Sequence, residues 1–317
     1  TQIAQYGIDF EVRQTNDGRG FGMFALKPFN VGDKILVERL AIHANQSELE
    51  VARDRFQACP TSIKDAIMGL YSGAVVNPEW HKQIEVAGDW WLKFKYNSFS
   101  CPETVTSLYL LVSRFNHCCL PNCVVCSDDD LFMHVTAAQP IAVGDELTII
   151  YSVCGKYDGI ESFKRAMKSQ WGFECSCHAC TTPKLAHKVE QAEVARVNIR
   201  RLIKDGMLKQ AFRNALGVIL LYEELGMCVS ALGVDVYNIL TGLMCLQKKT
   251  LHLARFSAFL SYRISQIIAD GGKHTCAYIS HMKHEAEHID TMDDYLAVEG
   301  TRFAWELDEG HEDALLR

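Results

Sequence analysis

Apolar and polar residues alternate with a period of two near the start of the chain. Residues 8–12 place apolar side chains at every second position, residues 34–38 form another short strand-like run, and residues 16–22 between them are rich in glycine. Alternation over short runs bounded by glycine is typical of half-buried strands. We therefore predict a small antiparallel β unit in residues 8–43. Gly20 and Gly22 would let a ligand approach bare backbone, although a tight turn explains them equally simply.

The spacing then changes to steps of three and four, which predicts a helical insertion over residues 44–92, broken by Pro60 and Pro78. We expect Trp90 and Trp91 to pack in its core. Residues 104–115 read as a helix. Residues 123–126 and 131–135 flank the acidic run 127–130 and predict a hairpin, and Gly144 precedes a strand that ends at Tyr151.

Helical periodicity dominates the chain beyond Pro183. It predicts helices over residues 189–204, 208–225, 234–246, 250–269 and 275–288, followed by an acidic segment at residues 290–312. Antiparallel helical hairpins, similar to a tetratricopeptide array, are the expected arrangement. The fold class is therefore α+β followed by an all-α part. We divide the chain at residues 1–43, 44–92, 93–158, 159–183 and 184–317.

Composition and cysteine content limit the class of protein and the cellular compartment to be expected. The chain has 317 residues, of which 48% are hydrophobic and 22% charged, and the net charge is −7. This is ordinary globular composition, and nothing in it predicts a direct nucleic-acid or membrane contact. The 13 Cys form an odd set spread over the whole length, which favours a reducing compartment, cytoplasmic or nuclear, over a disulfide framework. The chain begins with Thr rather than Met, which suggests that a targeting segment has been trimmed.

Candidate chemistry gathers in two segments. Residues 114–123 combine amide, imidazole and thiol groups directly after an apolar run, which indicates a binding site, because a core segment would not carry them uncompensated. Cys175, Cys177 and Cys180 then supply three thiols within six residues, a spacing typical of a zinc site that needs a fourth ligand. The candidates for that ligand are Cys118, Cys119, Cys123, Cys126 and His178.

A second zinc motif is weaker. Residues 284–288 match the H-E-x-x-H pattern of zinc peptidases. The motif is short, its surroundings are polar, and no strand-bounded cleft is evident around it. An exposed helix face is the better interpretation, and chelator-sensitive proteolysis abolished by His284→Ala would reverse it.

Taken in order, four motifs resemble the SET-domain lysine methyltransferases, and in particular the subgroup that joins SET to a MYND finger. They are Gly20-x-Gly22, Asn116-His117-x-Cys119-x-Pro121-Asn122, Glu146-Leu147-Thr148-x-x-Tyr151 and Phe173-x-Cys175-x-Cys177-x-x-Cys180. The resemblance covers roughly residues 8–180. It implies a β-rich SET fold in which a later strand threads the Asn-His-Cys segment as a pseudoknot. Residues 44–92 hold one Cys, Cys59, so we expect no MYND finger there.

The resemblance also implies roles for individual residues. Tyr151 would be the catalytic residue, beside the methyl group of S-adenosylmethionine. Residues of several segments would bind that cofactor: Arg19, Gly20, Phe21, Asn97, Asn116, His117, Tyr151 and Phe173. Phe99, Tyr151 and Trp171 would surround the substrate lysine, and Cys119 would complete a structural zinc site with Cys175, Cys177 and Cys180.

The implied function is protein-lysine N-methylation of a histone or another protein by a chain that acts as a monomer. The alternative is a SET-fold binding protein that keeps zinc and cofactor but has lost turnover. Two departures from the subgroup stand out: Cys118 replaces a usual Ser, and Trp171 replaces a common Tyr. The larger indole is expected to narrow or reshape the lysine channel.

Overall fold

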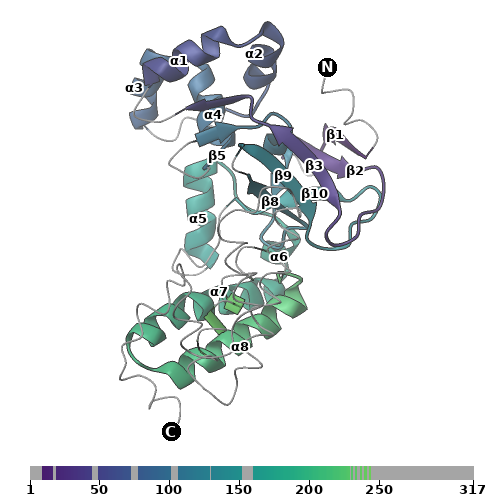
Figure 1. Ribbon diagram of the computed structural model, residues 1–317, viewed down its shortest axis with the longest axis vertical. Helices are drawn as coiled ribbons and strands as arrows, with labels where there is room; N and C mark the ends of the chain where they lie inside the picture. Colours follow the sequence, from purple (N-terminus) through teal and green to yellow (C-terminus); the bar gives the residue numbers. More distant parts are fainter. Residues whose placement is uncertain are drawn as a thin grey trace.

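The computed structural model describes most of residues 9–228, together with a few positions up to residue 243. The described ranges are 9–16, 19–44, 49–72, 78–100, 106–128, 130–151 and 160–228. Figure 1 shows small β-sheets at the centre, the helices α1–α3 at one end and the helices α7 and α8 at the opposite end, with α5 between them. The predicted helices at 250–269 and 275–288, and the H-E-x-x-H motif, lie outside the described residues.

The first sheet brings distant parts of the chain together. Its order is β1 (Phe10–Gln14), β2 (Phe21–Ala25), β10 (Glu146–Ile149) and β7 (Asn116–His117). The strands β1, β2 and β10 pair antiparallel, whereas β10 and β7 pair parallel. In that parallel pair Asn116 lies opposite Thr148 and His117 opposite Ile149. This is the pairing that the predicted pseudoknot needs, although the threading itself stays a prediction.

Two smaller sheets complete the β part. One has the order β3 (Lys34–Arg39), β9 (Phe132–Ala137) and β8 (Cys123–Ser127), and the other β4 (Ile42–Ala44), β6 (Thr106–Leu108) and β5 (Ser98–Ser100). The antiparallel pair β8 and β9 confirms the predicted hairpin around the acidic turn. The strands β3 and β10 form at the two runs that were predicted as strands.

The insertion is helical, as predicted. It contains α1 (Leu49–Ala58), α2 (Thr61–Met68), α3 (Pro78–Ala87) and α4 (Trp90–Asn97). Trp90 and Trp91 are 3% and 0% exposed, which confirms them as core residues. Trp90 stacks on Phe56 of α1 with ring centroids 4.6 Å apart, so aromatic packing joins α4 to α1.

The predicted helix over residues 104–115 is wrong. Residues 106–108 form β6, and only Val112–Arg114 turn as the 3-10 helix η3. Two tertiary interactions override the helical pattern. β6 pairs with both β4 and β5, and the buried carboxylate of Glu38 on β3 accepts the backbone N–H groups of Leu111 and Val112 at 2.8–3.0 Å.

Within residues 160–228, which the structure describes, four helices follow the β part: α5 (Ile160–Trp171), α6 (His178–Thr181), α7 (Pro183–Lys204) and α8 (Leu208–Leu225). The sequence reading did not include α5. The predicted helices at 189–204 and 208–225 are confirmed, and α7 begins earlier because Pro183 suits the first turn of a helix. The hairpin buries Glu193, whose carboxylate accepts hydrogen bonds from Tyr222 and Arg196.

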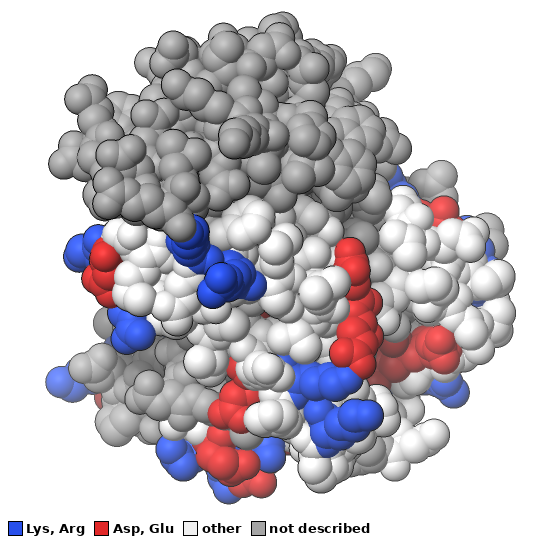
Figure 2. Space-filling model, turned by 90° about the horizontal axis from the view of Figure 1, so that it is seen from below, with Lys and Arg blue, Asp and Glu red and all other residues white. Residues whose placement is uncertain are grey.

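The largest apolar core joins the helical part to the β part. It contains Phe163 and Met167 of α5, the buried faces of α7 and α8, and also Cys119 and Cys175. Among the helices that the structure describes, none is both long and apolar enough to span a membrane. On the face shown in Figure 2, basic and acidic side chains lie beside one another among uncharged ones.

Candidate active site and metal centre

His117 connects the end of β10 to a group of thiols. Its ring is 4% exposed, and Nδ1 accepts the backbone N–H of Tyr151 at 3.0 Å. Because Nδ1 accepts, the neutral ring carries its proton on Nε2, which lies 3.4 Å from Cys119 Sγ and donates toward it. His117 therefore holds Tyr151 through one nitrogen and Cys119 through the other.

Asn116, one residue earlier, belongs to a polar group on the other side of the same strand pair. Its Nδ2 donates to Glu146 Oε1 at 2.7 Å and to the carbonyl of Phe21 at 3.2 Å. The second oxygen of Glu146 accepts from the Arg19 guanidinium at 2.6 Å. One carboxylate on β10 thus joins Asn116 of β7 to Arg19, which lies just before β2.

Tyr151 follows β10 and is held by its hydroxyl, which donates to the carbonyl of Phe115 at 2.7 Å. Burial raises the pKa of Tyr151, and the nearby charge of Glu146 raises it further, while the charge of Arg19 lowers it. The hydroxyl therefore stays protonated at neutral pH. The ring centroids of Trp171 and Phe173 lie 6.2 and 6.3 Å from that of Tyr151.

A cavity of about 310 Å³ opens over these groups. The structure brings all eight residues that were predicted to bind the cofactor into its lining: Arg19, Gly20, Phe21, Asn97, Asn116, His117, Tyr151 and Phe173. Seven other lining residues had not been assigned to this site: Gly69, Leu70, Tyr71, Tyr96, Ser113, Arg114 and Trp171. Of these, Arg114 gives the cavity a second guanidinium, and burial lowers the pKa of that group.

A second cavity, also of about 310 Å³, adjoins the first. It is lined by Phe99, Tyr151 and Trp171, the three residues predicted to surround the substrate. The two cavities share part of their lining: Tyr96, Asn97, Ser113, Tyr151 and Trp171. Of the five shared residues, the sequence analysis had not singled out Tyr96 and Ser113. Their signal in the sequence was position alone: Tyr96 is next to Asn97, and Ser113 lies shortly before Asn116.

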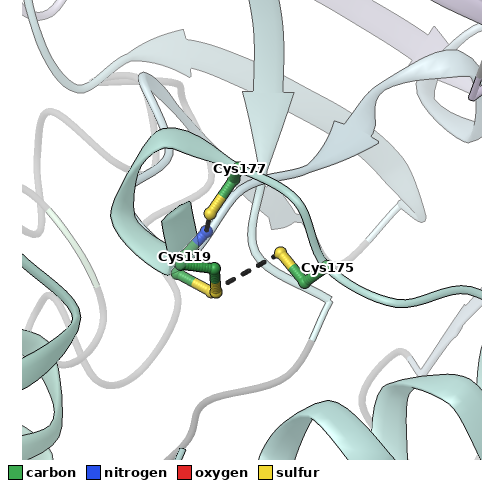
Figure 3. Close-up of side chains that lie close together, drawn as sticks. Cys119, Cys175 and Cys177 are labelled. Carbon is green, nitrogen blue, oxygen red and sulfur yellow. Dashed lines mark hydrogen bonds between the residues drawn. The ribbon is translucent and has the colours of Figure 1, made fainter. Parts of the chain in front are cut away.

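The predicted thiol cluster forms. The four Sγ atoms of Cys119, Cys175, Cys177 and Cys180 all lie within 4.8 Å of one another. Cys119 Sγ lies 3.9 Å from Cys175 Sγ and 3.5 Å from Cys180 Sγ. Figure 3 shows Cys119, Cys175 and Cys177 turned toward one another from two segments, the loop after β7 and the loop between α5 and α6.

This geometry fits zinc. A tetrahedral Zn²⁺ with bonds of about 2.3 Å holds its sulfur atoms about 3.8 Å apart, close to the observed separations. Hydrogen bonds among the thiols lower the pKa of Cys175 to about 5, mainly through Cys119, and also lower the pKa of Cys177, mainly through Cys118. The cluster therefore already favours thiolates. The four thiols can therefore hold one ion. Of the earlier candidates for the fourth ligand, Cys118, Cys123, Cys126 and His178 lie outside this described cluster.

Comparison with known proteins gives a family match for part of the chain. Residues 20–152 match the family model described as SET domain. The match covers less than half of the chain, and these residues are similar to a SET domain. They include Tyr151, which lines both cavities, and the match ends just after it. Cys175, Cys177 and Cys180 lie beyond the matched residues.

Known relatives match over the same part. A SET and MYND domain-containing protein of Dictyostelium discoideum is 38% identical over 81 residues, which are 26% of this chain and 23% of that protein. The human histone-lysine N-methyltransferase SMYD3 is 36% identical over 81 residues, 25% of this chain and 18% of its own. The chain thus spans about a fifth of the length of these relatives. These names agree with the predicted SET family and subgroup.

A solved structure is similar along most of the chain, but weakly. The SET domain of LSMT, determined bound to lysine and AdoHcy, covers 98% of this chain and 85% of its own, at 10% sequence identity and a TM-score of 0.39. At that level the similarity supports no argument about this chain's site.

Proposed function

We propose that this chain is an S-adenosylmethionine-dependent protein-lysine N-methyltransferase. The observation that carries the proposal is the wall that the two cavities share, where Tyr151 and Trp171 face both. A methyl donor in one cavity and an amine in the other would meet at that wall. In-line transfer between two bound reactants depends mainly on such alignment.

The first cavity suits the cofactor. Arg19 and Arg114 provide guanidinium groups for a carboxylate, and the ring of Phe173 offers a flat apolar surface for an adenine. When bound, S-adenosylmethionine supplies a methyl group activated by its sulfonium. The residues predicted to bind it, from Arg19 to Phe173, contribute the orientation.

The second cavity suits a lysine side chain. Phe99, Phe115 and Ile150 give it apolar walls, and such surroundings lower the pKa of an amine, which must be neutral to attack. Tyr151 is fixed by its bonds to Phe115 and His117, so its oxygen has a defined place beside the reacting groups. We further propose that the indole of Trp171 narrows this channel.

Zinc would be structural in this enzyme. Four protein thiols leave no open position for a substrate, which is the pattern of structural rather than catalytic zinc sites. The ion would tie Cys119, two residues from His117, to the loop that carries Phe173. It would thereby hold two sides of the cofactor cavity together.

The remaining parts of the proposal concern the whole protein. The substrate would be a lysine-containing protein segment, and the mildly acidic charge of −7 suits a basic partner better than a nucleic acid. We propose a monomer of the cytoplasm or nucleus, whose helical part continues beyond α8 as tetratricopeptide-like hairpins that close over the substrate cleft.

The test is transfer of labelled methyl groups to proteins of a cell extract, comparing the wild type with Tyr151→Phe. We expect the variant to lose at least about tenfold in rate, because a positioned group beside the reacting atoms is removed. Tyr109→Phe is the matched control, since its buried hydroxyl donates to the carbonyl of Leu131 at 2.9 Å outside both cavities. Equal activity of the wild type and Tyr151→Phe would refute the catalytic assignment.

The same protein preparation distinguishes the proposed enzyme from the alternative, a SET-fold binding protein that has lost turnover. A chain that binds S-adenosylhomocysteine in calorimetry but transfers no methyl group to peptide arrays or to itself would be a binding protein. A chain that binds no cofactor at all would contradict both readings.

A further inference from the structure

Glu146 is the first residue of β10 and does not line either cavity, yet both of its oxygens are bonded to residues that do. Oε1 accepts from Asn116 at 2.7 Å and Oε2 from Arg19 at 2.6 Å. Its side chain is 16% exposed and that of Arg19 is 27% exposed. The ion pair is thus screened from solvent more than a typical surface pair, so it can hold its geometry.

The strand beside Glu146 leaves room for it. A Cβ added at Gly22 would lie 2.5 Å from Glu146 Oε1 and 2.9 Å from Asn116 Nδ2. Real Cβ atoms do not approach that closely, so any other residue at position 22 would displace the carboxylate or the amide. The close approach of β2 requires glycine here, because the Glu146 and Asn116 pair occupies the space.

The bonds also fix which atoms face a ligand. The Asn116 amide nitrogen donates to two acceptors, Glu146 Oε1 and the carbonyl of Phe21, so this orientation of the amide is determined by its partners. The carbonyl Oδ1 is then the atom that can accept a hydrogen bond from a ligand. Arg19 is a fork of N–H donors held by Glu146 at the same cavity.

An acceptor for an ammonium beside a donor fork for a carboxylate is the complement of an α-amino acid. We propose that Glu146 is a positioning residue that holds Asn116 and Arg19 in place to recognise the amino-acid end of the cofactor. The inference rests on the proposed function. It predicts that Glu146 discriminates between ligands that carry the amino-acid part and ligands that lack it.

The experiment uses calorimetry with two ligands. S-adenosylhomocysteine carries the amino-acid part, whereas 5′-methylthioadenosine lacks it. We expect Glu146→Gln to raise the Kd of S-adenosylhomocysteine at least about tenfold, because the amide keeps one acceptor oxygen and places its NH2 donor opposite either Asn116 or Arg19. The Kd of 5′-methylthioadenosine should change less than about twofold, and zinc content should stay at the wild-type value.

Asp9→Asn is the matched control. It removes a carboxylate that pairs with Lys27 at 2.8 Å next to the same sheet but outside the cavity, so both Kd values should stay as in the wild type. Glu146→Asp is the second variant in case Glu146→Gln does not fold. Its shorter side chain cannot reach both partners, and it should weaken binding of S-adenosylhomocysteine selectively, by a smaller factor.

The outcomes separate the two proposals. If either Glu146 variant weakens both ligands equally, or neither, Glu146 has only a general structural role and this inference is overturned. If the wild type itself binds neither ligand, the proposed function fails first. Selective loss of S-adenosylhomocysteine supports both.

Discussion

The buried carboxylate of Glu38 offers a sharp test of how the fold positions the site. It lies on β3, is 7% exposed, and accepts the N–H groups of Leu111 and Val112 at 2.8–3.0 Å. These groups lead into η3, whose Ser113 and Arg114 line the cofactor cavity. We predict that Glu38→Ala destabilises the fold and also weakens binding of S-adenosylhomocysteine.

The magnitude follows from the bonds that are lost. Glu38→Ala leaves two backbone donors without their acceptor, and each buried unsatisfied group costs about 1–3 kcal/mol, or about 2–6 kcal/mol together. The wild type bears an opposing cost, the burial of a carboxyl group, and this burial raises the pKa of Glu38 despite the hydrogen bonds. The net loss should therefore lie in the lower half of the range, about 2–4 kcal/mol.

Urea unfolding measures this loss, with Glu11→Ala as the control. Glu11 is an exposed strand carboxylate with a 3.5 Å pair to Arg13, so its removal should change the free energy of unfolding by less than about 0.5 kcal/mol. If Glu38→Ala behaves like Glu11→Ala, the carboxylate does not hold η3 and the reasoning is wrong.

The pH dependence gives an independent check. Because burial holds the folded pKa of Glu38 above its ordinary value of 4.5, its contribution to stability is fully present below the unfolded pKa and is lost as pH rises through the folded pKa. Glu38→Gln does not titrate at this position. The stability of the wild type relative to Glu38→Gln should therefore fall as pH rises above about 4.5, by about 1.4 kcal/mol per unit of pKa difference. A relative stability that rises with pH in this window would contradict the assignment.

Two further predictions concern the metal centre and β2. Cys119→Ser should lose zinc at a chelator concentration at which the wild type retains it, because Cys119 is one of the four clustered thiols. Cys123→Ser is the control, since Cys123 is buried but lies outside the cluster. Equal retention of zinc by both variants would exclude the cluster as the zinc site. Gly22→Ala should lower the free energy of unfolding by about 1–3 kcal/mol, because its methyl group would overlap Glu146. Gly217→Ala, in open space on α8, should be neutral or stabilising. An unchanged stability of Gly22→Ala would disprove the close approach of β2 to Glu146.

The fold could be read from sequence where local pattern and tertiary context agree. The hairpin of β8 and β9 is such a case, since two apolar runs flank an acidic turn and pair in register across it. The helix α8 is another, because its apolar face and the left-handed Gly226 at its end are both local signals. The prediction of a helix at 104–115 was wrong because β4, β5 and Glu38 form hydrogen bonds with this segment, and these distant partners cannot be seen in the local sequence pattern.

The residues of the candidate site also differ in how far the sequence alone could predict them. Residues that touch a ligand need a particular chemical type, so Asn116, His117 and the thiols stand out in the sequence, and the structure brings them together. Glu146 acts through Asn116 and Arg19 rather than on a ligand, and although it belongs to one of the four motifs, the sequence assigned it no role. Glu38 is equally inconspicuous, 73 residues from Leu111, whose N–H it accepts. Only contacts across such separations reveal the roles of these two carboxylates: Glu146 bonds two residues that line the first cavity, and Glu38 bonds the backbone just before two others. The variants Glu38→Ala and Glu146→Gln should therefore differ in one measurable respect: the first changes stability and binding together, and the second changes mainly the choice between ligands.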